Sequence, residues 1–334
     1  MIVLRYLLFP FAILYGWITS IRNFFFDTGI LKSYSFDIPI IAVGNLSVGG
    51  TGKTPQIEYL IRLLSPNYKI ATLSRGYKRK SEGFVLANAH SNADLLGDEP
   101  FQMHLKFPEI IVAVDANRKN GIEQLLALNE APQVILLDDA FQHRKVKAGF
   151  YILLTAYDEL FCDDFMLPTG NLRESRSGAK RADAIIVTKC PENISDTEQQ
   201  NIKKKIGLNV PVYFSSIAYD DKVYNETESK TVSEMLTTDK VLLAGIAKPE
   251  PFFNYWKGAN DMKMTYPDHH DFTEADIKTI QEKAGARPII TTEKDYVRLK
   301  DNRIPSMFYL PIKSRLLFES AKFDASILRY VATN

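Results

Sequence analysis

The sequence predicts an α/β fold, with a doubly wound, mostly parallel sheet followed by a second, smaller α/β domain. From Ile38 onward, short apolar runs rich in β-branched residues alternate with segments whose apolar residues have helical spacing. This alternation is typical of repeated βαβ units around a parallel sheet. The chain has 334 residues, and single hydrophobic cores stop growing at roughly 250 to 300 residues. We therefore expect two domains.

The expected strands are short and almost wholly apolar, as buried parallel strands are. They cover residues 38–43, 69–73, 110–114, 134–137, 151–154 and 184–187 in the first domain, and residues 241–246, 288–292 and 307–310 in the second. The intervening stretch 221–239 is polar and charged, which is typical of a linker. The predicted division is an N-terminal helix (1–26), a larger domain (27–220), a hinge (221–239) and a smaller α/β domain (240–334).

The N-terminal 26 residues differ in character from the rest of the chain. Residues 6–21 carry no charge and are interrupted by Pro10 and Gly16. A membrane-spanning helix needs about 20 apolar residues, so this run favours a helix that lies in a membrane surface. Trp17 would sit at headgroup depth and Arg22 would extend to anionic lipid. Packing of the helix against the protein's own core is the alternative.

Composition excludes several classes of protein. Hydrophobic residues make up 46% and charged residues 24%, as in ordinary soluble domains. The 41 basic residues nearly balance the 40 acidic ones, so no net field attracts nucleic acid and we expect no such partner. Cys162 and Cys190 are the two cysteines, too few for a disulfide framework or a zinc site, which indicates a reducing cytoplasm.

A glycine-rich loop joins the first expected strand to the helix that follows it. Residues 49–54 read Gly-Gly-Thr-Gly-Lys-Thr, and glycines let successive N–H groups point at phosphate oxygens. Lys53 would reach the β- and γ-phosphates of ATP, and Thr54 would supply a hydroxyl ligand to Mg²⁺. The expected nucleotide-binding residues are Ser47, Val48, Gly49, Gly50, Thr51, Gly52, Lys53 and Thr54.

The loop departs from the general phosphate-loop pattern G-x-x-x-x-G-K-[ST], because Ser47 stands where that pattern has glycine. A turn of purely structural use is the alternative. Gly-Lys-Thr at a strand-to-helix junction nevertheless favours a P-loop NTPase-type domain. A second strand supports this, because residues 134–137 lead into Asp138 and Asp139, and such a strand end presents Asp138 to Mg²⁺. Turn formation is the other reason for an aspartate there.

Phosphoryl transfer to an alcohol also needs a base near the attacking hydroxyl. Asp98 is a loop carboxylate suited to this task, although it would equally cap a helix that begins at Pro100. Arg173 would neutralise charge on the γ-phosphate, or form only a surface salt bridge. Thr188-Lys189 and residues 291–295 follow strands and would flank the purine, but ordinary turn chemistry explains both.

Three histidines lie near carboxylates along the chain. His143 follows the acidic strand end, and His269 and His270 are flanked by Asp268 and Asp271. A histidine beside a carboxylate can orient or tune a base. Metal ligation is disfavoured, because the spacing and the further ligands of a metal site are not evident.

Six motifs together resemble the tetraacyldisaccharide 4′-kinases, the lipid A 4′-kinases of Gram-negative bacteria. They are Gly44-Asn45 with Gly49-Gly50-Thr51-Gly52-Lys53-Thr54-Pro55, Leu73-Ser74-Arg75-Gly76-Tyr77, Gly97-Asp98-Glu99-Pro100, Asp138-Asp139-Ala140-Phe141-Gln142-His143, Leu167-Pro168 with Leu172-Arg173-Glu174, and Asp268-His269. The resemblance covers nearly the whole chain. It implies transfer of the γ-phosphate of ATP to the 4′-hydroxyl of an acylated glucosamine disaccharide 1-phosphate, which gives lipid IVA. The implied location is the cytoplasmic face of the inner membrane, as a peripheral (monotopic) protein.

The resemblance also implies roles for particular residues. Asp98 is the expected base, and a C-terminal histidine tunes it; this role is carried over to His269, with His270 as the fallback. Asp139 and Arg173 complete the expected catalytic group. Family loops share the departure at position 47, with the first glycine displaced to Gly44, and Ala140 stands where many relatives have glycine. Two α/β/α domains would close around ATP, and we expect a monomer.

Two other functions remain compatible with the loop and the acidic strand. A P-loop GTPase or ATPase that acts as a conformational switch in metallocentre assembly or protein targeting would explain both features, but not the apolar N-terminus. A membrane-docked nucleotide-binding regulator without catalysis is the other. Unchanged turnover in an Asp98→Ala variant would favour the regulator, and phosphate release without a lipid acceptor would favour the switch.

Overall fold

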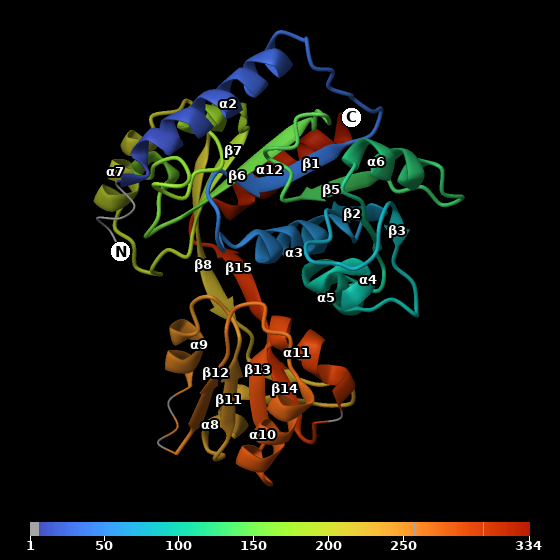
Figure 1. Cartoon of the computed structure of the whole chain (residues 1–334), viewed down its shortest axis with the longest axis vertical. Helices are drawn as coiled ribbons and strands as arrows, with labels where there is room; N and C mark the ends of the chain where they lie inside the picture. The colour runs from blue at the N-terminus through green and yellow to red at the C-terminus, as the bar shows by residue number, and fades with distance from the viewer. Residues whose placement is uncertain (1–6, 257, 259, 303) are drawn as a thin grey trace.

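The computed structural model describes residues 7–256, 258, 260–302 and 304–334. These residues form two α/β domains, each built on a sheet of its own, and the larger domain lies above the smaller one in Figure 1. The doubly wound, mostly parallel sheet that the sequence predicts is confirmed. The first six residues of the predicted N-terminal helix lie outside the described residues.

In the described part of the chain the larger sheet has nine strands, and its two outermost strands run antiparallel to their neighbours. In sheet order the strands are β15 (Ile312–Leu316), β8 (Val212–Tyr219), β7 (Ala184–Thr188), β6 (Phe150–Ala156), β1 (Ile40–Asn45), β5 (Val134–Asp138), β2 (Ile70–Ser74), β4 (Ile111–Val114) and β3 (Val85–Leu86). Strand β1 pairs in parallel with β5 on one side and β6 on the other. Its carboxyl end is therefore a topological switch point, where open α/β sheets bind ligands.

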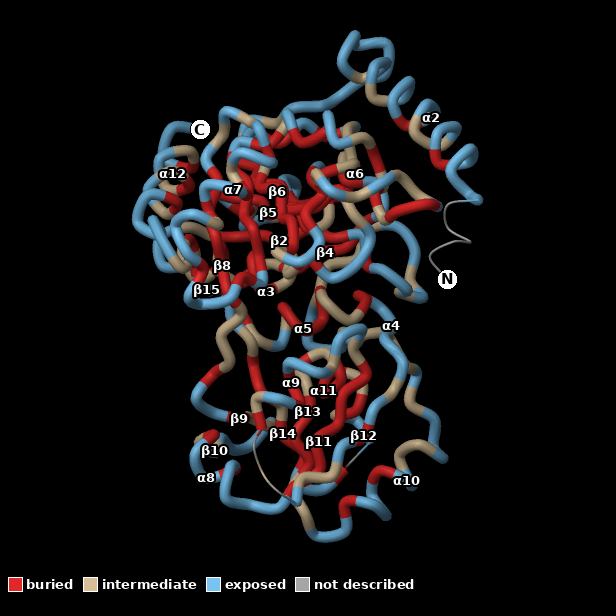
Figure 2. The backbone as a smooth tube through the Cα atoms, turned by 90° about the vertical axis from the view of Figure 1, so that its left-hand side faces the viewer, coloured by how far each residue is buried: buried red, intermediate tan, exposed pale blue. Residues whose placement is uncertain are grey.

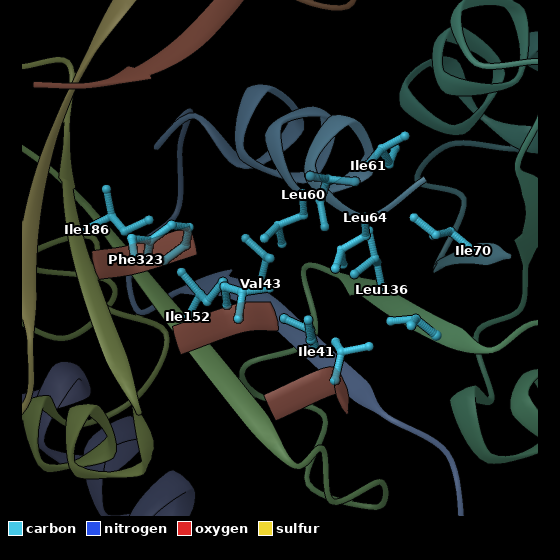
Figure 3. Close-up of a cluster of buried hydrophobic side chains, with 14 of the residues drawn as sticks. Ile41, Val43, Leu60, Ile61, Leu64, Ile70, Leu136, Ile152, Ile186 and Phe323 are labelled. Carbon is cyan, nitrogen blue, oxygen red and sulfur yellow. The ribbon is translucent and has the colours of Figure 1, made fainter. Parts of the chain in front are cut away.

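Apolar clusters cover both faces of this sheet. Successive side chains of a strand alternate between faces, so Ile41 and Val43 of β1 join one cluster, and Ile40 and Ala42 join the other. Figure 3 shows the first cluster, in which side chains of α3 and Phe323 of α12 pack near β1. The helices of the larger domain are α2 (Phe9–Asp27), α3 (Lys53–Leu64), α4 (Ala93–Leu96), α5 (Asp98–Lys106), α6 (Arg118–Leu126), α7 (Asp196–Ile206) and α12 (Ser320–Ala332), with the 3-10 turns η1 (Phe161–Asp163) and η2 (Arg176–Arg181).

The smaller domain is built around a six-stranded sheet in the described residues. In sheet order its strands are β10 (Ser229–Thr231), β9 (Lys222–Tyr224), β14 (Met307–Leu310), β13 (Ile289–Thr292), β11 (Val241–Ala244) and β12 (Met262–Thr265). Its helices are α8 (Val232–Leu236), α9 (Glu250–Tyr255), α10 (Glu274–Ala284) and α11 (Glu293–Leu299), with the 3-10 turn η3 (Lys300–Asn302). Its central strands β11, β13 and β14 coincide closely with the three strands predicted there.

The predicted domain boundaries are wrong at two places. Residues 221–239 are not a linker, because they form β9, β10 and α8 of the smaller domain. Residues 312–332 do not belong to the smaller domain, because β15 pairs with β8 and α12 buries Phe323, Ile327 and Val331 in the larger core. Three-residue strands are too short to show periodicity. An amphipathic strand or helix also does not reveal which of two cores it joins, because either core would bury its apolar side.

The chain crosses between the domains twice as a consequence. The first crossing leads from β8 into β9, and the second leads from β14 into β15, so β8 and β15 lie side by side above the junction (Figure 1). The Asp220 N–H donates to the Pro311 carbonyl (3.0 Å), which ties the two crossings together. This pair of connections is the place where any domain motion must hinge.

Helix α2 buries two small or polar side chains and leaves most of its large apolar side chains exposed. Ala12 and Thr19 are buried, and Asn23 Nδ2 donates to Glu174 Oε2 (2.9 Å). The exposed large side chains include Phe11, Leu14, Trp17, Ile18, Ile21 and Phe24. Figure 2 shows α2 at the edge of the larger domain with most of its length exposed. Among the described helices, none has both the length and the apolar character that crossing a membrane requires.

Candidate active site

The glycine-rich loop lies between β1 and α3, at the switch point of the larger sheet. Gly49 and Gly52 have φ values of 106° and 83°, in a backbone region that glycine adopts without strain. Asn45 Nδ2 donates to Thr51 Oγ1 (2.8 Å), and Thr188 Oγ1 donates to the Thr51 carbonyl (2.8 Å). The loop is thus held in shape at the N-terminus of α3, which is the arrangement that binds phosphate. Thr188 stabilises the loop from β7.

The structure gives a physical reason for glycine at position 44 and shows what the backbone contacts at position 47. A Cβ atom on Gly44 would lie 2.7 Å from Phe141 Cβ and 2.9 Å from the Phe141 nitrogen, so this position has no room for a side chain. Ser47 instead forms an isolated antiparallel bridge with Leu172. The next residue, Val48, donates its N–H to the Asn171 carbonyl (2.8 Å). The loop therefore contacts the segment that contains Arg173 through backbone hydrogen bonds.

Asp139 connects Lys53 with Arg173. Lys53 Nζ lies 3.7 Å from Asp139 Oδ1, and Arg173 donates from both terminal nitrogens to the Asp139 carboxylate (3.1 and 2.8 Å). Burial would raise the pKa of Asp139, but the hydrogen bond from Arg173 and the charges of Lys53 and Arg173 hold it below its ordinary value. Arg173 also donates to the Asn45 side chain. Three of the predicted residues thus form one charged cluster beside the loop.

Asp138 is the last residue of β5 and is buried. Burial and the charge of neighbouring Asp139 raise its pKa to about 6. Within the described residues, its Oδ1 atom has no hydrogen-bond partner. A buried carboxylate oxygen without a partner, next to a loop that suits phosphates, fits Mg²⁺, which prefers hard oxygen ligands. Thr54, in the first turn of α3 beside Lys53, is positioned in sequence to supply the second protein ligand.

Asp98 and His269 meet across the two domains. Asp98 is the first residue of α5, and its Oδ2 atom lies 3.2 Å from Nδ1 of His269, in the segment between β12 and α10. The Tyr77 ring packs edge-on against the imidazole, with 5.6 Å between ring centroids. His270 contacts Asp276 instead, with Nε2 3.1 Å from Oδ2. The structure therefore brings His269, and not the fallback His270, to Asp98.

Two further residues that contact this pair were not predicted as site residues from the sequence. Lys294 Nζ lies 2.7 Å from His269 Nε2, and Arg298 Nε donates to Asp98 Oδ2 (3.1 Å). Residues 291–295 were interpreted above as turn chemistry or as purine contacts, whereas they span the end of β13 and the first turn of α11, which places Lys294 at the catalytic histidine candidate. The available signal was two cations four residues apart directly after a predicted strand, a spacing that puts both on one face if the segment is helical.

Comparisons with known proteins agree with this geometry. The sequence model of the family described as tetraacyldisaccharide-1-P 4′-kinase matches residues 4–332. A tetraacyldisaccharide 4′-kinase of Flavobacterium johnsoniae is 65% identical over 99% of this chain and 98% of that protein. The enzyme of that name from Bacteroides thetaiotaomicron is 45% identical over 98% of this chain and 93% of that protein.

A solved structure gives the same relationship. The crystal structure of the "apo" form of LpxK from Aquifex aeolicus in complex with ATP has a TM-score of 0.81 and 31% sequence identity, and the match covers 98% of this chain and 99% of that one. The structural match extends over both domains, and the switch-type GTPase alternative is not favoured. This chain belongs to the tetraacyldisaccharide-1-P 4′-kinase family and is an ATP-dependent kinase.

Proposed function

We propose that this protein transfers the γ-phosphate of ATP to the 4′-hydroxyl of tetraacyldisaccharide 1-phosphate and so forms lipid IVA. The observation that carries the proposal is the Asp98–His269 contact (3.2 Å) between the two domains, in a protein that also has a formed phosphate loop. A nucleotide switch needs a loop and a metal ligand, but it needs no base for an alcohol. A carboxylate oriented by a histidine can act as the general base that phosphorylation of an alcohol requires.

In the proposed reaction the loop holds the phosphates of ATP and Lys53 approaches the β- and γ-phosphates. Mg²⁺, which Asp138 and Thr54 would hold, would neutralise part of the phosphate charge when bound. Asp98 accepts the proton of the 4′-hydroxyl while the hydroxyl oxygen forms a bond to the γ-phosphorus. ADP leaves with the electrons of the broken P–O bond. His269 orients the Asp98 carboxylate during this step.

Arg173 has a different proposed role from the finger that the sequence suggested. Both of its terminal nitrogens are engaged by Asp139 (3.1 and 2.8 Å), and Asp139 in turn faces Lys53 (3.7 Å). We therefore assign to Arg173 and Asp139 the task of positioning Lys53 beside the phosphates. A planar guanidinium that binds a carboxylate through two nitrogens fixes its orientation better than a single contact does.

The test of the proposed reaction uses radiolabelled ATP and tetraacyldisaccharide 1-phosphate in detergent micelles. We expect label to move to the lipid only when the disaccharide is present. No labelled lipid from folded protein with bound ATP would refute the kinase reaction on this acceptor. Phosphate release that does not depend on the disaccharide would support the switch function instead.

The exposed apolar face of α2 supports attachment to the surface of the inner membrane on its cytoplasmic side. Trp17 is 67% exposed and Phe11 62% exposed, and an apolar face of this kind inserts into the boundary between headgroups and acyl chains. The opposite face of the helix contacts the active-site segment, because Tyr15 Oη donates to the Arg173 carbonyl (3.0 Å). The helix would thus bring the membrane, which holds the substrate, close to the phosphate loop.

This arrangement shows how the membrane role should be tested. Deletion of residues 1–26 would remove Tyr15 and Asn23 as well, and with them the contacts to Arg173 and Glu174. We instead expect the triple substitution of Trp17, Ile18 and Ile21 by glutamine to lower recovery with membranes. The KM for micellar lipid should rise by on the order of tenfold or more, while the KM for ATP stays within about twofold, because each buried large apolar side chain contributes about 1.5–3 kcal/mol.

A matched control replaces exposed apolar residues elsewhere, Leu126 at the end of α6 and Leu236 at the end of α8, with glutamine. This variant should partition with membranes as the wild type does. Flotation with liposomes and steady-state kinetics measure the two effects. Equal membrane recovery of the α2 variant and the wild type would contradict the proposed attachment.

A further inference from the structure

Helix α11 of the smaller domain is the element that contacts the candidate base from the other side of the domain junction. Val297 of α11 packs in one apolar cluster with Leu96, Phe101 and Val114 of the larger domain. Close to this cluster, Lys106 Nζ of α5 lies 2.7 Å from an oxygen of Glu293 at the start of α11. These contacts fix the position of α11 against α5, the helix that begins with Asp98.

From this position α11 directs two cations at the Asp98–His269 pair. Lys294 and Arg298 are four residues apart, so they share one face of the helix. Lys294 Nζ lies 2.7 Å from His269 Nε2, and Arg298 Nη2 lies 2.7 Å from His269 Nδ1. Arg298 is almost completely buried, with 9% of its side chain exposed. A buried guanidinium kept beside a carboxylate is unlike the exposed ion pairs that contribute little.

The two carboxylate oxygens of Asp98 differ in their hydrogen bonds. Oδ2 accepts from Arg298 Nε (3.1 Å) and from Arg298 Nη2, and it lies 3.2 Å from His269 Nδ1. In the part of the chain that the structure describes, every hydrogen bond of this carboxylate ends on Oδ2, and Oδ1 accepts none. One oxygen is therefore anchored, and the other is left to accept a proton from an incoming hydroxyl.

Lys294 contacts the His269 ring at the nitrogen that does not face Asp98. An ammonium group has donors only, so His269 Nε2 accepts from Lys294. The other ring nitrogen, Nδ1, lies 2.7 Å from Arg298 Nη2 and 3.2 Å from Asp98 Oδ2. Contacts at both nitrogens therefore fix the orientation of the imidazole beside the carboxylate.

We propose that Arg298 and Lys294 are positioning residues of this kinase: Arg298 anchors Oδ2 of Asp98 and so leaves Oδ1 free for the acceptor hydroxyl, and Lys294 holds the His269 ring in its orientation beside Asp98. The inference rests on the proposed function, because it assigns the base of that reaction. Neither residue needs to touch substrate, since both act through the Asp98–His269 pair.

The charges around Asp98 determine the direction of the expected pH effect. Arg298, Lys294 and Asp295 face the site from α11, Asp268 and His269 from the segment before α10, and Glu99 from α5 itself. Burial raises the pKa of Asp98, but the hydrogen bond and charge of Arg298, with a smaller effect of His269, lower it below its ordinary value. Removal of Arg298 leaves the burial in place, so the pKa of Asp98 should rise and the acid limb of activity should move to higher pH.

The experiment compares pH profiles of kcat/KM for full-length wild type and Arg298→Gln with the disaccharide in detergent micelles. We expect the acid limb of Arg298→Gln to lie about one pH unit or more above that of the wild type, so kcat/KM should fall about tenfold or more at a pH on that limb and much less on the plateau. Lys294→Met should lower kcat without changing the KM for ATP.

The control is Lys300→Gln. Lys300 packs over the Phe101 ring of α5 at 5.1 Å and lies 3.8 Å from Glu226, so it is a cation at the same domain junction that does not contact Asp98. Its loss should leave the acid limb in place. A limb at the wild-type pH in folded Arg298→Gln, with kcat lowered equally at every pH, would assign Arg298 a structural role only and overturn the proposal.

A second variant keeps the test decisive if Arg298→Gln does not fold. Arg298→Lys retains the charge but not the contacts through two nitrogens, so we expect a wild-type acid limb with a reduced plateau. A plateau equal to the wild type would show that the guanidinium is not needed. Wild-type protein that makes no labelled lipid would refute the proposed function, whereas active wild type with an unmoved limb in Arg298→Gln would refute this inference alone.

Discussion

Replacement of Asp98 by asparagine is expected to lower kcat by roughly 10²- to 10⁴-fold, the usual contribution of a positioned general base. Asparagine retains the size of the side chain and a carbonyl oxygen for Arg298, so folding and ATP affinity should persist. The amide does not take up a proton at neutral pH, and the acceptor hydroxyl then has no base. Initial rates at saturating ATP and disaccharide measure the loss.

A suitable control for this substitution is Asp94→Asn. Asp94 lies in α4, four residues before Asp98, and pairs with Lys80 (2.8 Å) on the exposed surface. This pair lies away from His269 and Arg298, so kcat should stay within about twofold, as for most exposed ion pairs. If Asp98→Asn retained wild-type turnover, the base would have to be another group.

Replacement of Lys53 by methionine is expected to lower kcat on the order of 10²- to 10³-fold, the effect of removing one preorganised group that stabilises transition-state charge. Lys53 begins α3 and lies 3.7 Å from Asp139. Methionine keeps the length of the side chain but carries no charge, so charge that moves onto the leaving phosphate loses a partner. Single-turnover rates, with ATP affinity measured separately, distinguish lost chemistry from lost binding.

Lys69→Met serves as the matched control for Lys53→Met. Lys69 precedes β2 and pairs with exposed Glu130. Its loss should change kcat by less than about twofold, because an exposed pair of this kind contributes little. A Lys53→Met enzyme with the single-turnover rate of the wild type would exclude a role for this lysine in phosphoryl transfer.

The parts of the fold that were predictable are those with a strong local pattern. Residues 134–137 and 184–187 are uninterrupted apolar runs, and they lie in β5 and β7. Strand β15 was missed because its five residues, Ile312–Leu316, mix apolar and charged side chains. Its partner β8 lies about 100 residues earlier in the chain, and no local pattern contains that pairing.

The candidate site likewise has residues that the sequence predicts and residues that only the structure reveals. The phosphate loop and the aspartates of β5 are local motifs, so their residue types and spacing were sufficient to predict them. The choice between His269 and His270 was made through the family resemblance, and the structure places only His269 at Asp98. Arg298 is 200 residues from Asp98 in sequence, and nothing in the spacing of either segment relates the two.

The sequence by itself determined the class of fold, the nucleotide loop and the family, because each depends on residues that are neighbours along the chain. Only the tertiary structure decided where the domains divide and that Lys294 and Arg298 contact the Asp98–His269 pair. These features depend on contacts between the larger domain and α11, which a chain forms only when both domains have folded. The physical reason is that local periodicity specifies which side of an element is buried, whereas packing specifies what it is buried against.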